Sequence, residues 1–193
     1  QGYATMADET AEQMEERPTH VFLQAGVGSM AGAVAGYFVN RYPEHPPKFV
    51  VMEAEAADCH YRSALAGDGK MRTVGGDLST IMAGLACGEP NPISWDILRS
   101  AAAAFVSCPD WVSARGMRML AAPVKGDPAV TAGESGAVGM GVISALMEDD
   151  AYQELREALE LDSSSRVLLF STEGDTDPEN YRKIVWDGAY PAV

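Results

Sequence analysis

One turn, flanked by an apolar run and a run of small residues, constrains the fold of this chain more than any other feature. Thr19–Gln24 (THVFLQ) predicts a short strand, and Ala31–Arg41 predicts a helix. Gly26–Gly32 forms the turn, within the string Gln24-Ala25-Gly26-Val27-Gly28-Ser29-Met30-Ala31-Gly32. Glycines let the backbone present successive N–H groups to an anion, and the N-terminus of the helix adds positive charge. The pattern predicts a phosphate cradle; the alternative is a turn that only allows tight strand–helix packing.

The rest of the chain predicts one α/β domain, residues 1–193, with three αβα layers around a mostly parallel sheet. Lys48–Glu53 is a second apolar run, which gives the strand–helix–strand order of parallel pairing. Further strands are predicted at Phe105–Ser107 and at Arg166–Ser171, which is apolar enough for burial on both faces. Ala54–Pro92 predicts an irregular segment with a short helix near Ser79–Ala86. The other predicted helices are Tyr3–Arg17, Ser94–Ala104, Pro109–Ala122, Ser135–Met147, Asp150–Leu161 and Pro178–Trp186.

The net charge of −14 limits the possible partners. Nucleic acid and anionic membranes are bound by clustered Lys and Arg, so neither is expected here. The longest uncharged run, Val21–Asn40, is better explained by a buried strand, turn and helix than by a membrane span. Cys59, Cys87 and Cys108 show no CxxC pair or metal-finger spacing, which favours reduced thiols in a cytoplasmic protein and leaves a Cys59–Cys87 bridge open.

The glycine spacing also permits a Rossmann interpretation. Gly26, Gly28 and Gly32 loosely match the dinucleotide fingerprint, and Glu53 ends the next strand where an acid would bind a ribose. However, the spacing is G-x-G-x-x-x-G, and Glu53 lies somewhat farther along than the usual ~20 residues. An NAD-type binding module is therefore the main alternative function on pattern alone.

Several strings resemble known enzymes over essentially the whole chain. The order of four short strings is similar to fold-type II pyridoxal-phosphate (PLP) enzymes of the tryptophan synthase beta-like superfamily: Ala25–Gly28, Glu53–Cys59, Glu134–Ala137 and Ser171–Gly174. Three longer strings resemble the diaminopropionate ammonia-lyase family, in its C-terminal half: Gln1–Glu9 (QGYATMADE), Ile81–Pro92 (IMAGLACGEPNP) and Ser171–Asp177 (STEGDTD). The resemblance implies PLP as the cofactor and 2,3-diaminopropionate, a small amino acid, as the substrate.

The resemblance also implies roles for individual residues. Thr172 matches the hydroxyl position that binds the pyridine nitrogen, with Ser171 as the runner-up. Glu134 either lies near the ring edge or is only an acid in the first turn of a helix. The cofactor phosphate is expected on the backbone amides of Ala25, Gly26, Val27, Gly28, Ser29 and Met30.

No metal is expected, and the three histidines are not expected to act in catalysis. Glu53, Ala57 and Cys59 match a position where some relatives bind a divalent cation, but a cysteine suits Mg²⁺ or Ca²⁺ poorly. His60, next to Cys59, is expected to be a structural histidine with its hydrogen bonds satisfied.

The chain lacks a lysine in the context that PLP enzymes of this type require. That lysine holds the cofactor and later acts as the base at the substrate α-carbon. None of Lys48, Lys70, Lys125 and Lys183 stands in a Ser/Thr-Phe-Lys type of segment. We therefore expect a C-terminal portion without its N-terminal, lysine-bearing portion, inactive alone and part of a homodimeric lyase. A PLP-phosphate binder without catalysis is a weaker alternative.

Overall fold

Apolar, often β-branched runs form the strands of a parallel sheet in the computed structural model, which describes residues 2–192. The strands are β1 (His20–Gln24), β2 (Lys48–Ala54), β3 (Ala102–Cys108) and β4 (Val167–Leu169). Their order across the sheet is β3-β2-β1-β4, and every neighbouring pair is parallel. The sheet thus has β1 at its centre, paired with β2 on one side and β4 on the other.

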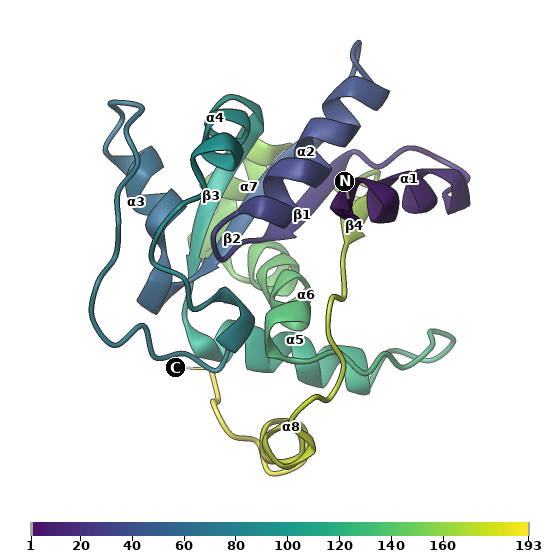
Figure 1. Cartoon of the computed structure of the whole chain (residues 1–193). Helices are drawn as coiled ribbons and strands as arrows, with labels where there is room; N and C mark the ends of the chain where they lie inside the picture. The colour runs from purple at the N-terminus through teal and green to yellow at the C-terminus, as the bar shows by residue number, and fades with distance from the viewer. Residues whose placement is uncertain (1, 193) are drawn as a thin grey trace.

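Side chains alternate along the strands and divide the core into two halves. Phe22 and Met52 point to one face of the sheet, while Val21 and Val51 point to the other. The first face is covered by α5 (Asp110–Ala121), α6 (Glu134–Glu148) and α7 (Gln153–Leu159). The second is covered by α1 (Gly2–Gln13), α2 (Ser29–Arg41) and α4 (Pro92–Ala101), as Figure 1 shows. The predicted three-layer α/β architecture is therefore confirmed.

Two further helices lie at the periphery of the sheet (Figure 1). α3 (Cys59–Leu65) follows β2 after a single 3-10 turn, Glu55–Ala57. α8 (Pro178–Val185) packs on α5 through the fully buried Ile184. The long uncharged run Val21–Asn40 consists of β1, the glycine turn and most of α2, and no helix within residues 2–192 is long and apolar enough to cross a bilayer.

Two local predictions are wrong. Arg166–Ser171 is not a strand buried on both faces: only Val167–Leu169 is extended, and all three residues are partly exposed because β4 is an edge strand. The segment after β2 contains α3, which was not predicted, whereas Ser79–Ala86 forms only a 3-10 turn at Ala83–Leu85. α3 was missed because a buried carboxylate from β2, rather than a local capping residue, satisfies its first amides.

Candidate functional site

The order of the strands places a crevice at the carboxyl end of β1. The chain adds β2 and β3 on one side of β1 and later returns to add β4 on the other side. In α/β sheets, ligands bind at such a switch point. A cavity of about 410 Å³ lies there, lined by Tyr3, Gln24, Ala25, Gly26, Val27, Gly28, Ser29, Met30, Gly84, Leu85, Cys87, Ser135, Thr172 and Glu173.

The glycine loop, residues 25–30, forms the first wall of this cavity. Gly28 adopts a left-handed φ of 85° at the N-terminus of α2, and no side chain caps the helix. Across the part of the chain that the structure describes, the N–H groups of Gly26, Val27 and Gly28 make no backbone hydrogen bond. Unpaired N–H groups at the positive end of a helix are suited to a phosphate, so these residues fit the predicted cradle. The Ala25 N–H instead donates to the Met52 carbonyl oxygen at 2.8 Å, so the prediction is wrong for that amide.

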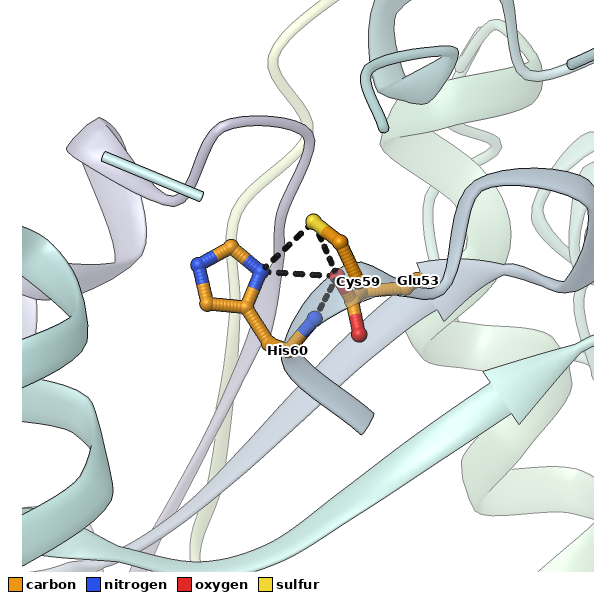
Figure 2. A group of neighbouring side chains, drawn as sticks. All are labelled: Glu53, Cys59 and His60. Carbon is orange, nitrogen blue, oxygen red and sulfur yellow. Dashed lines mark hydrogen bonds and ion pairs between the residues drawn. The ribbon is translucent and has the colours of Figure 1, made fainter. Parts of the chain in front are cut away.

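A buried trio lies behind the loop: Glu53 at the end of β2, with Cys59 and His60 at the start of α3 (Figure 2). One oxygen of Glu53, Oε1, accepts a hydrogen bond from the His60 N–H (2.9 Å) and lies 2.7 Å from His60 Nδ1. The other oxygen accepts from the Tyr61 N–H at 2.7 Å. The carboxylate therefore caps α3 and holds the imidazole ring in one orientation.

The second ring nitrogen of His60 faces the glycine loop. Nε2 is buried and has no hydrogen-bond partner in residues 2–192. A Cβ placed on Gly28 would overlap this atom. The imidazole thus fills the space beneath Gly28, and the prediction of a satisfied histidine holds for Nδ1 but is wrong for Nε2.

The same buried environment suppresses ionisation of two thiols. Burial, and next the negative charge of Glu53, raises the pKa of Cys59, whose Sγ lies 3.4 Å from Glu53 Oε1. Burial also raises the pKa of Cys108 to about 12. Cys59, Cys87 and Cys108 are all free thiols, and Cys59 Sγ lies 3.5 Å from the carbonyl oxygen of Cys87.

The trio also bears on metal and nucleotide binding. One potential ligand atom from each of Glu53, Cys59 and His60 lies within 4.8 Å of the other two, so His60, and not Ala57 of the aligned position, joins Glu53 and Cys59. Glu53 itself is fully buried and does not line the cavity. Its carboxylate is occupied by α3, which removes the acid that a Rossmann interpretation requires for the ribose.

The second wall follows β4 and is built from polar side chains. Thr172 lines the cavity, and its Oγ1 accepts a hydrogen bond from Gln24 Nε2 at 3.1 Å. Glu173 Oε1 accepts from the N–H groups of Ser135 and Gly136, the latter at 3.3 Å, at the start of α6. A carboxylate at this end of a helix is favoured by the helix dipole. The wall is therefore fixed by hydrogen bonds between β1, the segment after β4, and α6.

The structure separates the predicted site residues into two groups. The six loop residues and Thr172 line one cavity, although they are far apart in sequence. Ser171 and Glu134 are not among the lining residues; the Glu134 carboxylate accepts a hydrogen bond from Asn180 Nδ2 at 2.5 Å. Gln1, part of one resembling string, lies outside the described residues.

Sequence reasoning missed several lining residues, namely Tyr3, Gln24, Gly84, Leu85, Cys87, Ser135 and Glu173. All of them belong to strings already noted for their resemblance or for the glycine turn, so the strings were a usable signal. No lysine is among the lining residues in the described part of the chain. Lys48 pairs with Glu160, and Lys183 pairs with Glu179.

Comparison with known proteins gives consistent matches. A family model described as "pyridoxal-phosphate dependent enzyme" matches residues 1–173. The diaminopropionate ammonia-lyase of Escherichia coli (strain K12) is 53% identical over 98% of this chain and 48% of its own length. The chain therefore spans about half the length of the curated relatives it matches.

Solved structures agree with these matches. The Escherichia coli enzyme in complex with an aminoacrylate-PLP azomethine reaction intermediate has a TM-score of 0.89 and 50% identity, over 98% of this chain and 48% of that one. Its complex with D-serine has a TM-score of 0.88 and 48% identity, over 98% and 47%. Maize serine racemase, at 22% identity over 96% and 53% with a TM-score of 0.75, shows a likeness of fold alone. None of these matches favours the NAD-type alternative.

Proposed function

The chain belongs to the family of pyridoxal-phosphate dependent enzymes, and we propose that it is the C-terminal part of a diaminopropionate ammonia-lyase. In this proposal the complete protein converts 2,3-diaminopropionate to pyruvate and two molecules of ammonia by α,β-elimination. The observation that carries the proposal is one cavity with unpaired loop amides on one wall and the Thr172 hydroxyl on the other. The high identity to the bacterial enzymes supports the choice of substrate.

Each wall has a distinct binding task in this proposal. The amides of Gly26–Met30 bind the cofactor phosphate, since the Ala25 N–H already donates to Met52, and the α2 dipole stabilises its charge. Thr172 binds the pyridine nitrogen through a neutral hydroxyl, which does not enforce a protonated ring. Ser171, the residue before Thr172, is the runner-up for this contact, and Glu134 is an acid in the first turn of α6. When bound, PLP supplies the electron sink that acidifies the substrate α-proton and allows the β-amino group to leave.

The lysine that accepts this proton is proposed to lie outside these 193 residues, in the half of the relatives' length that the chain does not span. The 193 residues alone are then inactive. We further propose that the complete protein is a cytoplasmic homodimer, as the family resemblance and the three free thiols favour. The trio of Glu53, Cys59 and His60 is proposed to be structural rather than a metal site, because both carboxylate oxygens already accept α3 amides.

Borohydride reduction of the complete protein after incubation with PLP tests this assignment. Reduction makes the bond between cofactor and lysine permanent, so peptide mass spectrometry identifies the lysine. We expect one stoichiometric adduct outside residues 1–193, together with pyruvate and ammonia release from 2,3-diaminopropionate. An adduct at Lys48, Lys70, Lys125 or Lys183 would contradict the proposal that the cofactor-binding lysine lies outside residues 1–193.

A thermal-shift panel on the 193-residue chain provides the second measurement. A ligand that binds only the folded state raises the melting temperature. PLP and inorganic phosphate are expected to raise it, and NAD is expected to have no effect beyond that of phosphate. A selective response to NAD would favour the dinucleotide-binding alternative.

A further inference from the structure

Gln24 links the two walls of the cavity. It is the last residue of β1, it is buried (5% exposed), and it lines the cavity. Its side-chain Nε2 lies 2.7 Å from the carbonyl oxygen of Phe170 and 3.1 Å from Thr172 Oγ1. The residue that precedes the glycine loop therefore contacts the residue proposed to bind the ring nitrogen.

The chemistry of these neighbours fixes the orientation of the Gln24 amide. A backbone carbonyl can only accept a hydrogen bond, so the amide atom facing Phe170 must be the NH₂ group and not the oxygen. One hydrogen of that group is used by Phe170, and the other points to Thr172 Oγ1. Gln24 therefore donates to the Thr172 hydroxyl and cannot accept from it through the same atom.

This donation determines what Thr172 offers to the cavity. A hydroxyl has one hydrogen to donate and two lone pairs. Gln24 occupies one lone pair. Within residues 2–192, no other hydrogen bond involves Thr172 Oγ1. The hydroxyl hydrogen is thus left for a partner on the cavity side, where Thr172 is exposed.

We propose that Gln24 is a positioning residue that holds the Thr172 hydroxyl as a hydrogen-bond donor, so that the cavity selects a ligand with an acceptor at that point. The inference rests on the proposed function for the identity of that ligand, since the acceptor is then the unprotonated ring nitrogen of PLP. The inference adds to that function the residue that makes Thr172 the donor, and the ligand the acceptor, of their hydrogen bond. A glutamate at position 24 has no hydrogen to donate to Phe170 or Thr172, and its negative charge beside the cavity would favour a protonated ring nitrogen.

The first experiment compares ligand selection in the complete protein and in its Gln24→Met variant, which keeps the side-chain volume but has no donor. The probes are PLP and its deaza analogue, in which C–H replaces the ring nitrogen. One neutral hydrogen bond corresponds to about a fivefold difference in affinity. We expect the unaltered protein to prefer PLP by about fivefold and Gln24→Met to lose most of that preference.

The second experiment measures ¹⁵N NMR of ring-labelled PLP bound to the Gln24→Glu variant. We expect the signal to move from the position of an unprotonated pyridine toward that of a pyridinium, a shift that a merely structural role for Gln24 would not produce. Thr172→Ser, which keeps the hydroxyl, should leave both the signal and the PLP preference unchanged. If Gln24→Glu does not fold, the comparison with Gln24→Met decides alone.

The possible outcomes separate this inference from the proposed function. If Thr172→Val abolishes the preference for PLP while Gln24→Met retains it, Thr172 acts without Gln24 and the inference is wrong. If the preference and the ¹⁵N signal are unchanged in both Gln24 variants, the inference is also wrong although PLP binding stands. If the unaltered complete protein does not bind PLP, both the proposed function and the inference are overturned.

Discussion

The two walls of the cavity are built by different physical means. The loop wall, residues 25–30, presents backbone amides, and its shape depends on the packing of His60 under Gly28. The second wall, Thr172 and Glu173, presents side chains, and its shape depends on hydrogen bonds from Gln24 and from the start of α6. The loop wall follows a fully buried central strand, whereas the second wall follows a three-residue edge strand.

The difference predicts two kinds of sensitivity. Backbone held by close packing tolerates extra atoms poorly, because protein interiors have few voids to absorb them. Side chains held by hydrogen bonds tolerate changes of size but not changes of donor and acceptor. Substitutions behind the loop wall should therefore change the stability of the fold, and substitutions in the second wall should mainly change ligand affinity.

The largest effect is expected from Glu53→Leu. The substitution leaves the buried His60 ring and the first amides of α3 without their acceptor. Removing one partner of a buried charged network costs about 3 to 5 kcal/mol. Denaturant unfolding should show this loss, and Glu55→Gln, two residues away on the surface, should change the free energy of unfolding by less than about 0.5 kcal/mol. Equal effects of the two substitutions would contradict the role of the carboxylate.

A smaller effect is expected from Gly28→Ala. The left-handed conformation costs an L-residue about 1 to 2 kcal/mol, and the overlap with His60 Nε2 adds an overpacking cost of about 1 to 2 kcal/mol. Gly67→Ala is the matched control, because its φ is also positive, at 67°, but no atom lies near its Cβ. The difference between the changes in unfolding free energy caused by Gly28→Ala and Gly67→Ala measures the contact with His60. Equal changes would show that this contact does not constrain the loop wall.

Alkaline pH should reduce the stability of the fold by the next largest amount. The folded-state pKa of Cys108 is raised to about 12 and that of Cys59 is also raised, so both thiols stay protonated in the fold at pH values where an unfolded thiol ionises, above pH 9. The stability from their protonated burial is complete below pH 9 and is lost as pH rises toward 12. We expect a loss of about 1 kcal/mol for each of the two thiols between pH 8 and pH 10.

Urea unfolding at both pH values measures this loss. Cys108→Ala should show a shallower pH dependence than the unaltered chain, because one buried thiol no longer titrates. Cys87→Ala serves as the comparison, since Cys87 is only partly buried. A steeper pH dependence of the unfolding free energy in Cys108→Ala would show that groups other than Cys108 control the loss of stability at alkaline pH.

The smallest stability effect is expected from Glu173→Gln. The amide oxygen still accepts from the Ser135 and Gly136 N–H groups, so only the interaction of the charge with the α6 dipole is lost, about 0.5 to 1 kcal/mol. Asp175→Asn, exposed in the same segment, is the control and should be neutral. Thermal unfolding measures the change in stability, and titration with PLP measures the change in binding free energy. We expect the change in binding free energy to be the larger of the two.

Sequence patterns predicted the central elements well and the peripheral ones poorly. Val21–Leu23 and Phe49–Met52 are continuous apolar runs whose pattern requires burial, and the glycines after β1 signal the loop directly. α3 was missed because its first amides depend on Glu53, which comes from another element. The exposure of β4 depends on what pairs with its free edge, and local composition carries no information about that.

The site was predictable to a similar extent. The loop residues were predicted from the glycine turn and Thr172 from a string that resembles known enzymes, and the structure brings them to one cavity. Gln24 was quoted as part of the turn but was given no role, because its contact with Thr172 spans 148 positions in sequence. Residue type alone does not show which way an amide points.

The position of β1 between β2 and β4 has a consequence for biosynthesis. A ribosome makes the glycine loop long before Thr172 and Glu173, the residues that line the opposite side of the cavity. In the proposed function, the loop amides can bind a phosphate group before then, but the pyridine ring has no partner. The cavity is complete only after β4 has joined the sheet, so binding of the whole cofactor would show that the strands have reached their final order.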